Sequence, residues 1–283
     1  VIIKEIENLD EKERSSGLLN LLGACKLLRR DTNDLISANS HFKEAYLKAK
    51  TTKSGLEALI NFINSIAEIF DEKIEIIEDD QISSFIDEAI LYFDDADEYF
   101  GFNEKLILAI VRIYKRQNNL EKILFYLKKL IDNKCLSSKV LSSYIYRNCF
   151  IDTWKQKDFF SFSKILNSNL PVYSKENLIP LNTKKNKKIK LAFLSSDINN
   201  YHSITYFLKT VLLNYDKNKF EISLILNSKE DYTSKEFKSL CDGSISIKDL
   251  NDIDSINKIR QNNYDIIVDL MGVSSSNKLV LFK

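Results

Sequence analysis

The residue best suited to chemistry is a histidine in a polar loop. His202 is one of two histidines among 283 residues. It follows an apolar run over residues 189–194 and a polar turn over residues 195–197. A histidine can exchange a proton near neutral pH or hydrogen-bond an anion. Taken alone, a polar histidine before a helix is more often a cap or a surface residue. Because an amphipathic pattern begins at Ser203, we expect His202 at the mouth of a strand–loop–helix unit, where doubly wound proteins bind ligands.

Three further polar residues share this loop. Ser196, Asp197 and Ser203 offer hydroxyl, carboxylate and backbone N–H groups to a ligand. Asp and Ser before a helix also cap its unpaired N–H groups. The two interpretations are equally favoured, and they are compatible if the helix end is itself an anion site.

A second polar turn follows another apolar run. Asp269 would lie in or beside a buried strand, where an unpaired carboxylate is costly, so we expect it to have a partner or to face a cleft. Gly272 is expected to permit a tight turn. Ser274 is expected to cap a following helix, with ligand contact as the less favoured alternative.

These residues lie in a region where strand and helix patterns alternate. Apolar runs predict strands buried on both faces, and the alternation predicts a parallel, Rossmann-like sheet over residues 188–283. The predicted strands are 189–195, 220–226, 244–248 and 265–271, and the predicted helices are 203–214, 233–240, 252–262 and 275–282.

The region before residue 170 is predicted to be helical. Apolar residues recur at helical spacing over 18–28, 35–46 and 106–131, with further helices over 56–70 and 82–100. Gly23 offers a close approach to a neighbouring helix, as in a tetratricopeptide repeat. His41 is expected on a solvated helix face. Pro171, Pro180 and a lysine run mark a linker over 171–187, between helical repeats (1–170) and the sheet region.

The motifs of the sheet region resemble those of the O-GlcNAc transferase/SPINDLY family of glycosyltransferases. The resemblance starts at Leu194-Ser195-Ser196-Asp197 and His202-Ser203-Ile204. It continues in the same order through FEISLIL (220–226), DSINKIRQNN (254–263), YDIIVDLMG (264–272) and SSSNKLVLF (274–282). It covers about the last third of the chain. Members of the family also carry tetratricopeptide repeats before this region.

The resemblance implies a transferase of the GT-B type. It places His202 in the active-site cleft as a polar or proton-handling group, with the other polar residues named above near the substrates. The reaction would move a sugar, GlcNAc from UDP-GlcNAc, to Ser or Thr of a protein held by the helical repeats. Neither metal nor cofactor is implied. A second lobe would supply most of the donor site, so we expect this chain to be inactive alone.

Two alternatives remain open. The chain could transfer fucose, as SPINDLY-type relatives do, or it could be a non-catalytic interaction scaffold built on helical repeats. The sequence does not identify the acceptor protein, and the donor sugar depends on the second lobe.

The composition indicates which kinds of partner and which cellular compartment to expect. The formal net charge is +1, which gives no overall field for nucleic acid or anionic membranes. No apolar run approaches the roughly 20 residues of a membrane span. The 4 cysteines form no C-x-x-C pair, which favours a reducing cytoplasm and argues against a zinc site. The abundance of Lys, Asn and Ile suggests a bacterial source.

Overall fold

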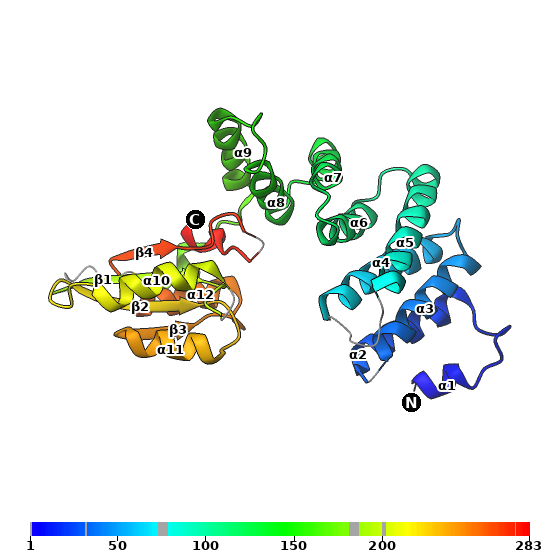
Figure 1. The fold of residues 1–283 in the computed structure, drawn as a ribbon, viewed down its shortest axis with the longest axis horizontal. Helices are drawn as coiled ribbons and strands as arrows, with labels where there is room; N and C mark the ends of the chain where they lie inside the picture. The colour runs from blue at the N-terminus through cyan, green and yellow to red at the C-terminus, as the bar shows by residue number, and fades with distance from the viewer. Residues whose placement is uncertain (1, 32, 73–78, 181–186, 200–201, 275) are drawn as a thin grey trace. The chain divides into compact units, whose positions relative to one another are not determined.

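The computed structural model describes all residues except 1, 32, 73–78, 181–186, 200–201 and 275. The chain forms two compact units, Val1–Cys135 and Leu136–Lys283. Helices make up the first unit, and a parallel sheet with its own helices lies in the second (Figure 1). The predicted fold class, helical repeats followed by a Rossmann-like lobe, is confirmed.

The described part of the first unit is mainly helical. Asn118 has φ of 56°, and the Asn119 side chain accepts a hydrogen bond from the backbone N–H of Lys122, so these asparagines form a turn within the apolar pattern of 106–131. The helices are α1 (Ile2–Glu7), α2 (Ser16–Arg29), α3 (Asp34–Lys48), α4 (Lys53–Glu72), α5 (Asp79–Phe100), α6 (Glu104–Arg116) and α7 (Leu120–Asp132).

Gly23 provides the predicted close approach, between α2 and α3. A Cβ atom at this position would lie 2.6 Å from Cε1 of Phe42. The Phe42 ring is 1% exposed, so it has little room to move away. The first helix pair therefore depends on a residue without a side chain at this point.

His41 does not lie on a solvated face, contrary to the expectation from sequence. Its ring is half-buried, and Nε2 lies 3.5 Å from the hydroxyl oxygen of Ser37. Burial lowers the pKa of His41, and the nearby Lys26 ammonium lowers it further. The helical period placed His41 beside charged residues, but it did not reveal that α2 covers this side of α3.

The second unit begins with α8 (Ser138–Asn148) and α9 (Gln156–Asn169). The segment after α9 is attached to α12 (Asp252–Gln261). The hydroxyl of Tyr173 donates to Asp252 at 3.0 Å, and the backbone N–H of Ile179 donates to Asn257 at 2.8 Å. Contacts divide the chain at Cys135, whereas the predicted linker lies between α9 and the first strand. The linker remains a prediction, and its residues 181–186 lie outside the described part.

The sheet is parallel, with the strand order β3-β2-β1-β4. Ile189 pairs with Phe220, Leu226 with Ser246, and Leu194 with Asp269. β1 is thus an inner strand, and the chain passes from one sheet edge back to the other to form β4. The strands are β1 (Ile189–Ser195), β2 (Phe220–Leu226), β3 (Gly243–Ser246) and β4 (Ile266–Asp269).

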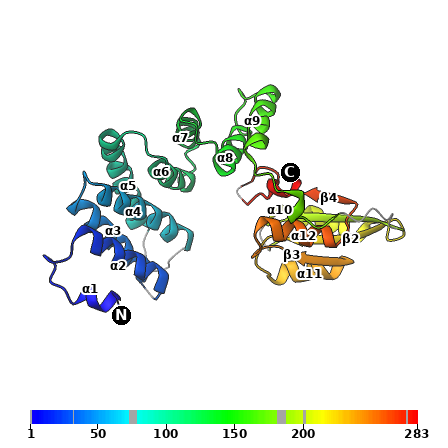
Figure 2. The same ribbon diagram turned by 180° about the vertical axis from the view of Figure 1, so that it is seen from behind.

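Helices cover both faces of this sheet (Figures 1 and 2). On one face, α10 (Ser203–Asn214) and α11 (Tyr232–Leu240) bury Leu208, Leu212 and Phe237 against β1 and β2. On the other face, Ile259 of α12 packs in a second apolar cluster with β1 and β2. Successive residues of β1 enter opposite clusters, as expected for a strand buried on both faces.

One predicted helix is wrong. The segment 275–282 was expected to be α-helical, but the only helical turn described there is the 3₁₀ helix η2 (Leu279–Phe282). Asn277 uses both its backbone and side-chain N–H groups on the carbonyl of Ser274, at 3.2 and 2.7 Å. Such local bonds by Ser and Asn compete with helix formation.

We expect Gly23→Ala to lower the free energy of unfolding by up to about 2 kcal/mol. Overpacking against Phe42 costs about 1–3 kcal/mol, which outweighs the helix-propensity gain of about 1 kcal/mol. Gly17→Ala is the matched control in the same helix, because a Cβ there would meet only an ordinary contact at 3.9 Å. Urea unfolding followed by circular dichroism measures both. Equal stability of the two variants would contradict the tight approach.

Limited trypsin digestion should distinguish the predicted linker from the division at Cys135. We expect the first cut within the lysine run 184–188, in which Lys187 and Lys188 are exposed. Lys134 is also exposed, but backbone hydrogen bonds from Lys134 and Cys135 to the end of α7 hold its turn. Fragment masses identify the cut. A first cut after Lys134 would place the boundary between α7 and α8.

Candidate functional site

The candidate site lies at the carboxyl ends of β1 and β4. The loop after β1 leads to α10 on one face of the sheet, whereas the chain after β4 leads to η2, whose Leu281 packs with the opposite cluster. A point where neighbouring loops diverge in this way is where open α/β sheets bind ligands. The predicted site residues fall in these two loops, at the end of β4 and at the first residue of α10.

His202 immediately precedes α10 and caps it. Its Nδ1 atom accepts a hydrogen bond from the backbone N–H of Ile204 at 3.3 Å. Its carbonyl accepts bonds from the backbone N–H and hydroxyl of Thr205, at 3.1 and 2.7 Å. The residue is exposed. The imidazole is therefore held by the helix end and remains open to solvent.

This cap determines the tautomer of the ring. Because Nδ1 accepts a hydrogen bond, the neutral ring carries its proton on Nε2. Nε2 can then donate to an anion beside the positive end of the helix dipole. To take up a proton, the ring must use Nδ1 and release the N–H of Ile204. The geometry thus favours hydrogen-bond donation over general-base catalysis.

Ser196 joins three loops at this edge. Its hydroxyl oxygen accepts a bond from Nδ2 of Asn227 at 3.0 Å. It lies 2.9 Å from Sδ of Met271 and 3.3 Å from the carbonyl oxygen of Ser276, to which it donates. The residue is 9% exposed. In this arrangement the hydroxyl is used within the protein.

Asp197 and Ser203 are placed differently from Ser196. Asp197 is half-buried, and its backbone N–H donates to the hydroxyl of Ser195 at 2.9 Å. Its carboxylate has no hydrogen-bond or ion-pair partner in the described part of the chain. Ser203 is exposed at the first position of α10. Neither residue caps the helix, because His202 does.

Asp269 has hydrogen-bond partners, which is one of the two outcomes that the sequence predicted. Its two carboxylate oxygens accept backbone N–H groups of Met271 at 2.9 Å and Gly272 at 3.2 Å. Gly272 has φ of 53°, in the left-handed region, which agrees with its predicted role in a tight turn. The carboxylate therefore shapes the loop after β4.

Two hydroxyl groups near this edge are buried without a hydrogen-bond partner among the described residues. They belong to Ser274, which follows β4, and Ser228, which follows β2. Sequence reasoning missed Ser228, Asn227 and Met271. Their position in the sequence could have indicated them, because Asn227 directly follows β2 as Ser196 directly follows β1.

Elsewhere among the residues that the structure describes, no comparable set of groups comes together. Burial raises the pKa of the Cys241 thiol to about 12, so it is protonated at neutral pH and a poor nucleophile. Across the described residues, no group of three or more His, Cys, Asp or Glu side chains is placed to hold a metal ion. No described helix has the length and apolar character needed to cross a membrane.

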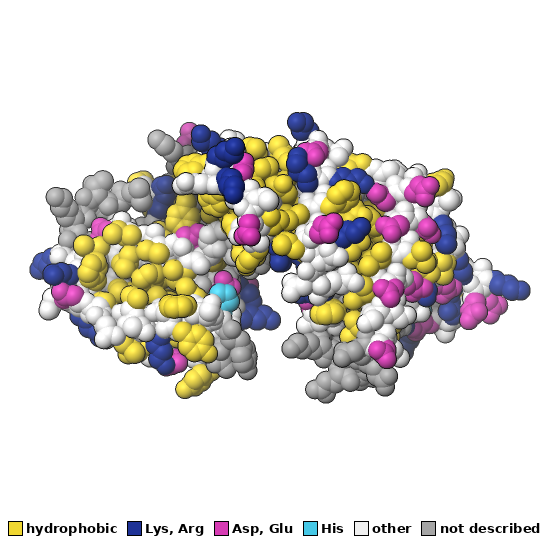
Figure 3. Space-filling view, turned by 45° about the horizontal axis from the view of Figure 1, so that its top comes forward, with side chains coloured by type: hydrophobic (Ala, Val, Ile, Leu, Met, Phe, Trp, Pro, Cys, Tyr) yellow, Lys and Arg dark blue, Asp and Glu magenta, His cyan; other side chains and the backbone are white. Residues whose placement is uncertain are grey.

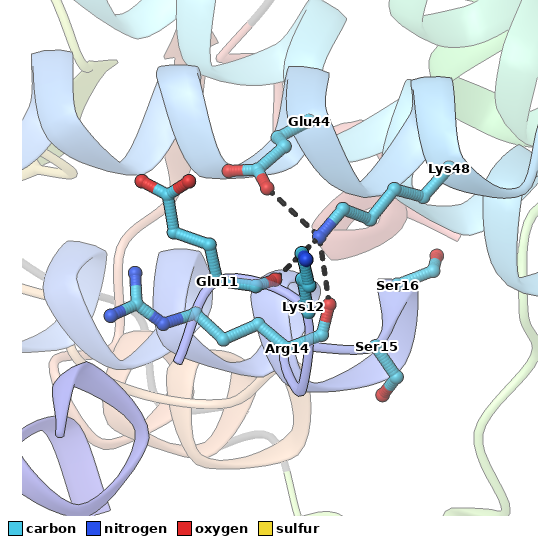
Figure 4. A pocket seen from close by; sticks show the side chains of 7 residues that line it. All are labelled: Glu11, Lys12, Arg14, Ser15, Ser16, Glu44 and Lys48. Atoms are coloured by element: carbon cyan, nitrogen blue, oxygen red, sulfur yellow. Dashed lines mark hydrogen bonds and ion pairs between the residues drawn. The ribbon is translucent and has the colours of Figure 1, made fainter. Parts of the chain in front are cut away.

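The first unit has a polar hollow of about 620 Å³, and charged groups that line it hold the protein's own backbone in place (Figure 4). The ammonium of Lys48 donates to the carbonyls of Glu11 and Arg14, at 3.1 and 3.0 Å, and pairs with Glu44 at 3.1 Å. The Arg14 guanidinium in turn binds the carbonyl of Leu9. These cations hold a loop against α3.

The comparison with solved structures decides the fold. A mutant of the Thermobaculum terrenum O-GlcNAc transferase matches with a TM-score of 0.64 and 14% sequence identity. The fold is O-GlcNAc transferase-like. The match covers 93% of this chain and 48% of the other, so the chain spans about half the length of that transferase. At this identity the likeness concerns the fold alone. No family model matches the sequence, and no curated protein does.

The cap predicts different outcomes for two substitutions of His202. His202→Ala should cost about 0.5–2 kcal/mol of stability because it removes the cap. His202→Asn should cost less, because asparagine is among the best N-caps. Urea unfolding measures the stability of both variants. In the wild type, ¹⁵N NMR of the neutral His202 ring should find its proton on Nε2. A proton on Nδ1 would contradict the cap.

Proposed function

We propose that this chain forms part of a glycosyltransferase that moves a sugar from a nucleotide donor to a protein hydroxyl. The donor is UDP-GlcNAc and the acceptor is Ser or Thr. One observation carries the proposal: an exposed histidine caps the helix after the first strand, at the divergent loops of an O-GlcNAc transferase-like fold. The identity of the sugar and that of the acceptor are both part of what we propose.

The chemistry of such a transfer suits the properties of His202. The leaving nucleotide diphosphate gains negative charge as the bond to the sugar breaks. The Nε2–H group and the end of α10 would stabilise that charge, as fixed donors do in a transition state. The carboxylate of Asp197, which has no partner among the described residues, would accept a hydrogen bond from the acceptor hydroxyl. Ser203 at the helix end would contact the donor phosphates.

The remaining groups have supporting roles in this proposal. Asp269 and Gly272 shape the loop after β4, and Ser196 ties it to the loop after β1. The hydroxyl of Ser274, for which the described residues offer no partner, would meet the sugar after a local shift. The helical repeats would hold the acceptor polypeptide along their surface. The nucleotide sugar is a substrate, and the proposed reaction uses neither a cofactor nor a metal ion.

One observation favours a second candidate, a non-catalytic interaction scaffold. The hydroxyl of Ser196 and the carboxylate of Asp269 are both engaged within the protein. Groups engaged in this way hold loops together without a ligand. In this case the repeats bind a partner, and the sheet lobe serves as a docking surface.

A transfer assay separates the candidates. We expect a natural protein that contains this chain together with a second lobe to transfer radiolabelled GlcNAc from UDP-GlcNAc to protein, and the chain alone to have negligible activity. His202→Asn should lower kcat/KM by at least roughly 10²-fold, the scale of one acid–base or charge-stabilising group. It should leave stability nearly unchanged.

The control is His41→Gln, which removes the other histidine and should leave the transfer rate unchanged. Transfer of fucose from GDP-fucose, but not of GlcNAc, would replace the donor in this proposal. Absence of transfer from either donor would favour the scaffold. Full activity of the His202→Asn enzyme would remove His202 from the mechanism.

A further inference from the structure

Helix α10 presents an apolar face to solvent. It buries Leu208 and Leu212 against the sheet, but its opposite side is open. Figure 3 shows hydrophobic side chains gathered on this part of the second unit. The open side includes Tyr206 (74% exposed), Phe207 (72%), Val211 (46%) and Leu213 (59%).

This face also lacks charge. The twelve residues of α10 contain one charged residue, Lys209. Its ammonium pairs with Glu236 of α11 at 2.6 Å, to the side of the open face. By contrast, α11 and α12 carry several charged residues of both signs. A surface helix ordinarily has a polar outer face, so an apolar one of this extent indicates an interaction surface.

We propose that α10 pairs with the α10 helix of a second copy of this chain, antiparallel about a two-fold axis at Thr210. In a two-fold contact each patch meets its own copy, so a charge on the axis would face its like. The open face of α10 avoids this repulsion. Thr210 has a small side chain, which lets the two helix backbones approach closely.

Helical spacing gives the register of this pair. Ser203, Tyr206, Thr210 and Leu213 follow the 3–4 rhythm of a helix seam. The two-fold axis brings a side chain that precedes Thr210 in one copy opposite a side chain of the other copy. That second side chain follows Thr210 by a similar distance and lies on the same side of the helix. Tyr206 therefore lies near Leu213 of the second copy, and Phe207 lies near Asn214.

The size of the face determines the strength of the pair. An aromatic side chain buries roughly 150–250 Å², so two aromatics and two aliphatic residues per copy give a total on the order of 1,000 Å². That area lies at the lower limit for specific association. We therefore expect a reversible dimer with a Kd on the order of 10 μM or weaker.

Sedimentation equilibrium of the whole chain tests the proposal, over a range from about 1 to about 500 μM. We expect a monomer–dimer equilibrium in the wild type. Phe207→Glu should weaken it at least roughly 10-fold, because it removes an aromatic anchor that the dimer buries and puts a charge into the apolar seam of each copy. Phe207→Glu is a surface change, and circular dichroism verifies its folding.

The control is Phe125→Glu, at an aromatic residue of α7 that is 60% exposed. It should leave the equilibrium unchanged. A wild-type chain that stays monomeric throughout the range overturns the proposal, whatever other partner its α10 face binds. So does a dimer that persists in Phe207→Glu, or one that both variants weaken equally.

Discussion

Strand β1 must satisfy hydrogen bonds on both edges and apolar contacts on both faces, and the rest of the second unit follows from that. β2 and β4 occupy its two edges. Phe193 enters the cluster under α10 and α11, and its neighbours Ala192 and Leu194 enter the cluster on the opposite face. Because the layers are fixed in this way, the loops that leave β1 and β4 must separate. The polar residues of the candidate site lie in these two loops and at the ends of the elements that they join.

Ser196 shows how this space is held in shape. A single hydroxyl contacts side chains from the loops after β2 and β4, so these loops and that of β1 share one hydrogen-bonded centre. His202 is held independently, by the end of α10. The imidazole therefore has a fixed position and tautomer before any ligand arrives. A donor fixed in advance needs little reorganisation when charge develops beside it.

The elements were predictable where one local pattern controls them. Apolar runs located the strands, and Gly272 indicated its turn, because both signals are contained in a few residues. Gly23 could be recognised because only a glycine admits a ring as close as that of Phe42. The segment 275–282 was misassigned because the amide of Asn277 competes with the helix through the carbonyl of Ser274.

Side-chain direction was less predictable, because it depends on partners distant in sequence. Asn227 and Met271, which engage Ser196, lie 31 and 75 residues further along the chain. His41 is shielded by α2, and its helical pattern alone did not reveal this. His202 is the N-cap, which agrees with the structural role that its place before a helix allowed. The order of elements could thus be derived from sequence, whereas the exposure of each polar group required the structure.

The pairing of β1 with β4 also sets an order of assembly during synthesis. Leu191 pairs with Ile266, so one edge of β1 stays open until the ribosome has made most of the second unit. The helix pairs of the first unit close over much shorter separations, and local contacts form faster than distant ones. A nascent chain should therefore carry folded repeats while the centre of its sheet is still exposed. For that interval, protection of β1 depends on β2 and α10, which emerge before β4.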